Sequence, residues 1–245
     1  MSPTFLALLV AHLLGEFVLR RDPPSRPEGA PIPLLLHAAL VTALSALLLG
    51  TLNAWLLGSL LLVHSLSDAS RSHLLPRGPR SFLGEQGVRL ALLAGLAWSF
   101  PGAWETGLWG SQLTGDALRT YAQVLVVTAG ILATVPAAGV VIGLLLEPLT
   151  RELEEEQSPA GGLRNGGRYI GWLERGLVLI LYLSGQASGI GFVLATKSIL
   201  RFGEIKDSEH RKLAEFILIG TFLSFALALS GGLLTEWALG AIRAD

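Results

Sequence analysis

Long apolar stretches alternate with short polar segments along the whole chain. A helix needs about 20 residues to cross the ~30 Å hydrocarbon core of a bilayer. Eight stretches come near that length, and they cover residues 3–20, 32–50, 53–70, 81–100, 121–147, 169–185, 187–203 and 213–239. This pattern predicts an all-α fold, a polytopic transmembrane helical bundle of about eight spans.

Two of these stretches are irregular. Residues 187–203 are short, contain glycine and are interrupted by Lys197, so this segment either crosses the membrane or is re-entrant. Residues 121–147 contain Pro136, which predicts a kink or a steep tilt. If residues 187–203 do not cross, the C-terminus moves to the cytoplasmic side.

The stretches form two groups, which predict two membrane modules. Residues 1–100 would form a four-helix module, and residues 121–242 a second four-helix module. Residues 101–120 contain Trp and Gly and few charges, which is typical of an extracytoplasmic interfacial connection with aromatic anchors. Residues 149–168 are polar, acidic and rich in Gly, and we expect a flexible cytoplasmic loop there.

The composition supports a membrane protein and excludes some partners. Hydrophobic residues make up 51% of the chain and charged residues only 15%, against roughly 25% in soluble domains. The net charge of -1 provides no basic surface for a nucleic acid. Because the chain has no cysteine, imidazole and carboxylate groups are its strongest metal ligands.

The basic residues predict the orientation of the bundle. Most of the 18 Lys and Arg residues fall in alternate connections, around residues 20–26, 71–80, 151–168 and 197–212. Short loops that are rich in these residues stay on the cytoplasmic side. We therefore expect both termini to be extracytoplasmic, in a multi-pass protein of the bacterial cytoplasmic (inner) membrane.

Polar residues interrupt the first four stretches at one depth, close to their cytoplasmic ends. These residues are His12, Glu16, His37, His64, Asp68, Glu85 and Gln86. His12 and Glu16 share one helix face because they are four residues apart, as do His64 and Asp68. An unpaired charge at this depth would cost several kcal/mol, so we expect these groups to face the interior of the bundle.

A metal-dependent membrane hydrolase is the first interpretation of this layer. Imidazole and carboxylate ligands suit Zn, Mn or Fe, and an open coordination position would activate a water molecule for attack on a lipid or another interfacial substrate. The candidate metal ligands are His12, His37, His64 and Asp68. Glu16 or Glu85 would act as the catalytic general base.

Other interpretations of the same residues stay open. The layer could carry protons or cations in a coupled transporter. Its polar groups could also only hydrogen-bond across helices, in a non-catalytic membrane subunit. A serine nucleophile near His64, such as Ser65 or Ser67, lacks a third group at a defined spacing. Besides the bilayer, the expected partners are a lipid or small-molecule substrate, a second copy of the chain or another membrane protein.

Four short motifs resemble an uncharacterised bacterial membrane family, known as domain of unknown function 3307. They are HLLGEF, the lone His of the second stretch, HSLSDASR and FLGEQGVR, and the resemblance covers about residues 4–95. Glu16 and Glu85 occupy positions where the family pattern has Asp, and Arg89 stands where a His is expected. Arg cannot ligate a metal, which weakens the case for a metal site. The resemblance implies no established activity.

A second polar layer is predicted in the C-terminal half. Glu174 and Arg175 lie within an apolar stretch, and Lys197 interrupts the next one. Glu174 and Lys197 could pair across helices, and Arg175 could reach a carboxylate or a lipid phosphate. Alternatively, Arg175 and Lys197 extend their charged ends to the headgroups.

Overall fold

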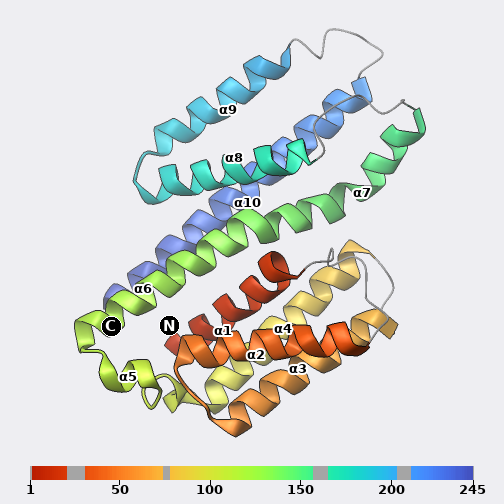
Figure 1. Cartoon of the computed structure of the whole chain (residues 1–245). Helices are drawn as coiled ribbons and strands as arrows, with labels where there is room; N and C mark the ends of the chain where they lie inside the picture. Colours follow the sequence, from red (N-terminus) through yellow and green to blue (C-terminus); the bar gives the residue numbers. More distant parts are fainter. Residues whose placement is uncertain (1, 21–30, 74–77, 157–164, 203–210, 245) are drawn as a thin grey trace. The chain divides into compact units, whose positions relative to one another are not determined.

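The computed structural model describes residues 2–20, 31–73, 78–156, 165–202 and 211–244, and all its regular elements there are helices (Figure 1). The elements are α1 (Pro3–Leu14), η1 (Gly15–Leu19), α2 (Pro31–Leu49), α3 (Ala54–His73), α4 (Pro79–Ser99), η2 (Pro101–Ala103), α5 (Leu108–Gln112), α6 (Gly115–Leu132), η3 (Ala133–Ala137), α7 (Ala138–Glu156), α8 (Gly166–Leu183), α9 (Ala187–Phe202) and α10 (Arg211–Ala244). The predicted all-α class is confirmed.

Each predicted apolar stretch coincides with a helical segment, but their lengths and hydropathies differ. Within the described residues, two helical segments are long and apolar enough to cross a membrane, Gly115–Leu153 and Lys212–Arg243. The apolar segment Pro3–Leu19 is shorter, and α3 and α4 are less hydrophobic than α1 because they carry polar residues. Helix length and hydropathy thus support two spans, and not the predicted eight.

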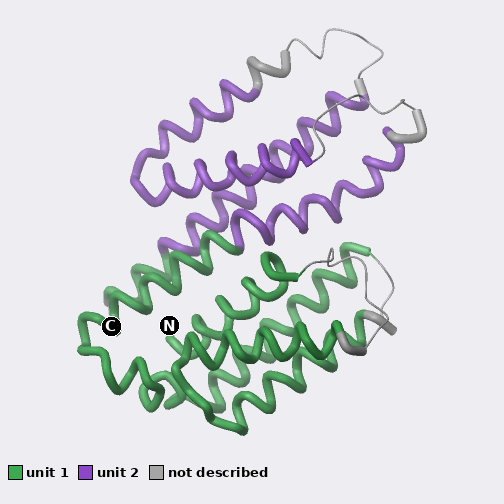
Figure 2. Tube along the Cα trace, viewed as in Figure 1, with its two compact units in different colours: residues 1–132, 237–245 green, residues 133–236 purple. Residues whose placement is uncertain are grey.

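The chain divides into two compact units (Figure 2). The first unit comprises Met1–Leu132 and Trp237–Asp245, and the second comprises Ala133–Glu236. The division falls between α6 and η3, and not at the predicted connection 101–120. The reason is that α6 packs against α1, and Trp109 and Tyr121 attach residues 101–121 to the end of α2.

Helix α1 is the central element of the first unit. It packs against α2, α4 and α6, while α3 packs against α2 and α4. Side chains on all sides of α1 are buried as a result, including Leu6, Leu8 and Val10, which are at most 1% exposed. A polar group on α1 therefore lies inside the unit whichever way it points.

In the first unit, charged and imidazole side chains are buried beside the apolar core, on helices whose other faces expose apolar side chains. On α4, Val88 is 59% exposed whereas the next residue, Arg89, is fully buried. On α3, Leu62 and Leu66 are exposed and His64 is fully buried. The outer surface of these helices is thus suited to a hydrocarbon environment.

Residues 101–121 cap the C-terminal end of α2. Gly50 adopts a φ of 65° and begins a Schellman turn, in which Thr51 N–H donates to the Ala46 carbonyl at 3.1 Å. The Leu47 carbonyl accepts from Gly50 N–H at 3.2 Å and from the Trp109 indole at 2.7 Å, and the Tyr121 hydroxyl donates to the Leu48 carbonyl at 2.9 Å. The aromatic residues predicted to lie in the interface are used here to cap a helix.

In the second unit, α8 packs against η3, α7 and α9. Its apolar core contains Val178, Phe225 and Ala228. Pro136 lies within η3, so the expected irregularity takes the form of one π-helical turn.

The predicted loop 149–168 is shorter than expected. Helix α7 continues to Glu156 and α8 begins at Gly166, while residues 157–164 lie outside the described part of the chain. The segment TRELEEE favours a helix because it consists largely of Leu, Glu and Arg, which are good helix formers.

Candidate functional site

A close approach of α1 and α2 positions the first carboxylate of the candidate site. A Cβ atom on Gly15 would overlap the Val41 side chain and would lie 3.7 Å from His37 Nε2. Gly15 begins the π-helical turn η1, so Glu16 follows directly at this contact. Glu16 Oε2 then lies 3.5 Å from His37 Nε2.

The fully buried guanidinium of Arg89 contacts three carboxylates from three helical segments. Its Nη1 lies 3.0 Å from Glu16 Oε2, and its Nη2 lies 2.5 Å from Asp68 Oδ1 and 2.5 Å from Glu85 Oε1. Arg89 therefore joins η1, α3 and α4 at one point. The net free energy of an ion pair that is shielded from water depends strongly on such geometry, because both charges have lost their hydration.

Two more arginines complete this network. Arg71 Nη1 donates to Glu16 Oε1 at 2.8 Å, and its Nη2 donates to Asp68 Oδ1 at 3.2 Å. Arg20 Nη1 lies 3.1 Å from Glu16 Oε2. Three guanidinium groups thus face three carboxylates, and the charges of the network balance.

The three histidines form a contiguous group beside the ion network. The rings of His12 and His64 stack at 5.5 Å between centroids, and the ring of His37 meets His64 edge-on at 6.4 Å. His12 Nε2 is hydrogen-bonded to Gln86 Oε1 at 3.0 Å, and His37 Nδ1 to Asp68 Oδ2 at 2.7 Å. Neither ring nitrogen of the fully buried His64 has a hydrogen-bond partner among the described residues.

A smaller set of residues has the spacing of a metal site. One atom each from Glu16, His37 and Asp68 lies within 4.8 Å of the others, and all three residues are buried. Two nitrogen or oxygen ligands at ~2.0–2.2 Å from one ion are at most ~4.4 Å apart, so these atoms are close to the spacing that one ion requires. The same carboxylates also contact Arg89 and Arg71, which compete with a cation for their oxygens.

The convergence predicted from the sequence is confirmed for its principal members. His12, Glu16, His37, His64, Asp68, Glu85 and Gln86 all lie in or beside this network. Arg89 joins the carboxylates directly. The group with metal spacing, however, includes Glu16, expected as a base, and does not include His12 or His64, expected as ligands.

Sequence reasoning missed Arg20 and Arg71 as members of the site. Both were interpreted only as positive charges that mark the cytoplasmic side. Their spacing was the available signal, because Arg20 is four residues after Glu16 and Arg71 is three residues after Asp68. Oppositely charged residues at these spacings are neighbours on a helix.

The second polar layer is divided between two kinds of contact. Lys197 Nζ donates to Glu174 Oε2 at 2.5 Å, so of the two alternatives for Lys197 the structure has the pairing across helices. Arg175 is 4% exposed, and its Nη2 donates to the Val135 carbonyl at 3.0 Å. The expectation that Arg175 extends to the headgroups is therefore wrong, because η3 and Ser224 bind its guanidinium inside the unit.

Comparisons of this chain with protein-family models, curated proteins and solved structures find no match. The resemblance of residues 4–95 to the family of domain of unknown function 3307 stays a prediction. The site is therefore interpreted from its geometry alone.

Proposed function

We propose that this chain is a multi-pass protein of the bacterial cytoplasmic membrane and a proton-coupled transporter, with the ion network and histidines of the first unit as its proton-binding site. The observation that carries the proposal is a contiguous group of three histidines on a charge-balanced network, in which neither ring nitrogen of His64 has a hydrogen-bond partner within the described part of the chain.

The arrangement of buried charged residues in the first unit supports the membrane setting. Leucines on α3 are exposed, while Glu16 on η1, Asp68 on α3 and Arg89 on α4 are buried. Lipid offers no hydrogen bonds to polar groups, so they are expected inside a bundle and paired with one another. The membrane setting therefore extends to helices that length and hydropathy alone do not support as spans.

Charge balance favours proton chemistry over a resident divalent metal. The three carboxylates already contact three guanidinium groups, so a divalent ion would add two positive charges to a neutral, buried network. A proton adds only one charge, and a neutral imidazole such as that of His64 has one ring nitrogen with a lone pair that can accept it. Movement of that proton between His64, His37 and Asp68 would alter the contacts that hold three helices together.

A metal-dependent hydrolase is the second candidate. The carboxylate–imidazole group of Glu16, His37 and Asp68 favours it, because these residues have the spacing of a divalent-metal site. An ion bound there would need to displace Arg89 or Arg71 from the carboxylates. The metal would then polarise a substrate or activate a water molecule.

Proton flux into reconstituted vesicles tests the proposed function. The purified chain is placed in vesicles that enclose the pH dye pyranine, and the outside is acidified under a potassium diffusion potential. We expect faster acidification than in protein-free vesicles, and a loss of most of this flux in His64→Ala. Leu66→Ala is the matched control, because Leu66 lies on the outer face of the same helix.

Metal analysis of the same preparation separates the two candidates. One equivalent of Zn, Mn or Fe that disappears in Asp68→Asn, without proton flux in the wild type, would overturn the proposal in favour of the hydrolase. If the wild type shows neither proton flux nor bound metal, both candidates fail, and the network is a structural element of a membrane subunit.

A further inference from the structure

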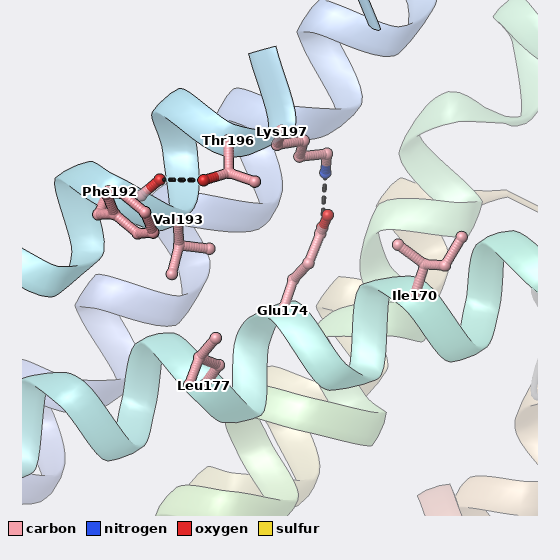
Figure 3. Close-up of a pocket in the computed structure, with 7 residues that line it drawn as sticks. All are labelled: Ile170, Glu174, Leu177, Phe192, Val193, Thr196 and Lys197. Atoms are coloured by element: carbon pink, nitrogen blue, oxygen red, sulfur yellow. Dashed lines mark hydrogen bonds and ion pairs between the residues drawn. The ribbon is translucent and has the colours of Figure 1, made fainter. Parts of the chain in front are cut away.

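A cavity of about 470 Å³ lies between α8 and α9 in the second unit, away from the residues of the proposed proton site in sequence (Figure 3). Ile170, Leu177, Phe192 and Val193 line most of it. Its volume falls within the range of ~300–1,000 Å³ that is typical of small-molecule sites. The cavity is therefore large enough for part of an amphiphilic molecule.

One ion pair provides the polar feature of this cavity. Figure 3 shows Glu174 on α8 and Lys197 on α9 facing each other, with Lys197 Nζ 2.5 Å from Glu174 Oε2. The hydroxyl of Thr196, which also lines the cavity, donates to the Phe192 carbonyl of its own helix at 2.9 Å. An apolar space with a single charged end fits a molecule with an apolar chain and a charged head.

The apolar walls of the cavity reach the surface of the unit. Phe192 is 75% exposed, Ile170 51% and Leu177 44%. A ligand can therefore enter from the side, which is the direction from which lipids reach a helix pair in a bilayer. Side chains this exposed also tolerate substitution, so the site can be tested without disrupting the core.

Lys197 is the basic group of the cavity, and Glu174 is its acidic group. Arg175, next to Glu174 in the sequence, is not among the residues that line the cavity, because its guanidinium donates to the carbonyl of Val135 and the hydroxyl of Ser224. The Lys197 ammonium has two N–H donors besides the one on Glu174, and these are the donors that an anionic head would engage.

Aromatic and basic side chains at the start of α8 indicate the level of the headgroups. The Arg168 guanidinium lies 5.1 Å from the ring of Trp172 and 5.7 Å from that of Tyr169. Such side chains are typical of the membrane interface. Glu174 is six residues further along the helix, or about 9 Å at 1.5 Å per residue, a depth that the carboxylate or phosphate of an acyl lipid can reach.

We propose that the cavity between α8 and α9 binds an anionic amphiphile with one acyl chain, its chain against Leu177, Phe192 and Val193 and its head at Lys197. The Lys197 ammonium has three N–H donors and uses one on Glu174, so it can bind the head while it keeps this pair. A fatty-acid carboxylate and a lysophospholipid phosphate share this chemistry. The proposal does not depend on proton transport.

Photolabelling of the full-length protein in detergent tests this site. The probe is palmitate with a diazirine in its chain and a terminal alkyne, and labelled peptides are identified by mass spectrometry. We expect labels concentrated in the segments that contain Leu177 and Phe192. Unlabelled palmitate should compete, whereas hexadecyltrimethylammonium at the same concentration should not. Competition by lysophosphatidylglycerol would show that the site also accepts a phosphate head.

Substitutions separate the cavity from a general affinity for lipid. Leu177→Trp fills the space and should lower labelling about tenfold, whereas Leu173→Trp, on the exposed face of the same helix, should not change it. Lys197→Gln should weaken competition by palmitate about tenfold, the loss typical of one charge-assisted hydrogen bond. Glu174→Gln frees the ammonium and should preserve or strengthen that competition.

Two results would overturn the proposal. Labels spread evenly over the exposed apolar faces of the helices would mean that palmitate coats the protein without a site. Equal displacement by the cationic competitor, with loss of labelling in Glu174→Gln, would mean that the ligand is a cation.

Discussion

The two units bury arginine in different ways. In the first unit, the guanidinium of Arg89 contacts Glu16, Asp68 and Glu85, and the charges are compensated within the site. In the second unit, Arg175 donates to the Val135 carbonyl and the Ser224 hydroxyl, and none of the ion pairs among the described residues gives it a carboxylate. Arg89 thus joins helices through carboxylates, whereas Arg175 on α8 joins η3 and α10 through a carbonyl and a hydroxyl.

This difference separates two uses of a buried charge. A network of ion pairs that joins several helices couples the positions of those helices. A change in the protonation of one residue therefore alters the contacts of all of them. An arginine bound to a carbonyl satisfies a backbone group at a place where Pro136 disturbs the regular helix. We therefore expect functional sensitivity around Arg89 and mainly local structural sensitivity around Arg175.

Arg89→Gln should have the largest effect of the substitutions that probe this comparison. It leaves three buried carboxylates short of a cation, and breaking a buried ion pair in this way costs about 3–5 kcal/mol. In a chain of this size, the melting temperature should fall by roughly 10 °C, measured by tryptophan fluorescence in detergent. Adding Glu85→Gln should recover part of this loss, because it restores the balance of charges. An unchanged melting temperature in Arg89→Gln would contradict the network.

Gly15→Ala should be the next most harmful change. Its Cβ would overlap the Val41 side chain, so α1 and α2 must separate at the point that positions Glu16. Overpacking of this kind costs about 1–3 kcal/mol, and thermal unfolding will measure it. Val41→Ala in the same chain should relieve the loss. Gly176→Ala in the second unit is the matched control, because its nearest neighbour, Val135 Cγ2, is at an ordinary 3.9 Å.

Arg175→Gln should destabilise the protein less than Arg89→Gln. The Val135 carbonyl loses a charged donor, worth about 1.5–3 kcal/mol, but removal of a buried charge without a carboxylate partner offsets part of that cost. Thermal unfolding and proton flux measured together provide the contrast. The melting temperature should fall moderately while the flux per folded molecule stays at the wild-type value. A loss of flux equal to that of His64→Ala would remove the distinction between the units.

Tyr121→Phe should have the smallest effect. It deletes the hydroxyl that donates to the Leu48 carbonyl at the end of α2, and it keeps the ring that stacks on Trp104. The loss of one such hydrogen bond costs about 1 kcal/mol, or a few degrees in the melting temperature. A larger loss would indicate that residues 101–121 stabilise the bundle beyond this cap.

The helices were predictable because apolar periodicity and length determine them locally. The start of α9 at Ala187 and the π-helical turn that contains Pro136 follow from residues within a few positions of each. The division between the units was not predictable, because it depends on long-range packing. Trp109 and Tyr121 attach residues 101–121 to the end of α2, and only their hydrogen bonds to its carbonyls reveal this.

The members of the site were largely predictable, but their roles were not. Equal depth in the predicted spans indicated that His12, Glu16, His64 and Asp68 could meet. The sequence did not show that guanidinium groups pair with these carboxylates. Arginines near the ends of apolar stretches usually indicate only which side of the membrane a loop lies on. The choice between a metal and a balanced ion network depends on distances of a few ångströms between helices.

The pairing within each helix has a consequence for how the protein is made. Glu16 has Arg20 on its own segment, Asp68 has Arg71 and Glu85 has Arg89, each three or four residues away. In the proposed membrane setting, each of these segments would carry a locally neutral pair into the bilayer before the neighbouring helices are made. The contacts between helices would then form by exchange of partners among these pairs, so each carboxylate would have a cationic partner on its own helix at every stage.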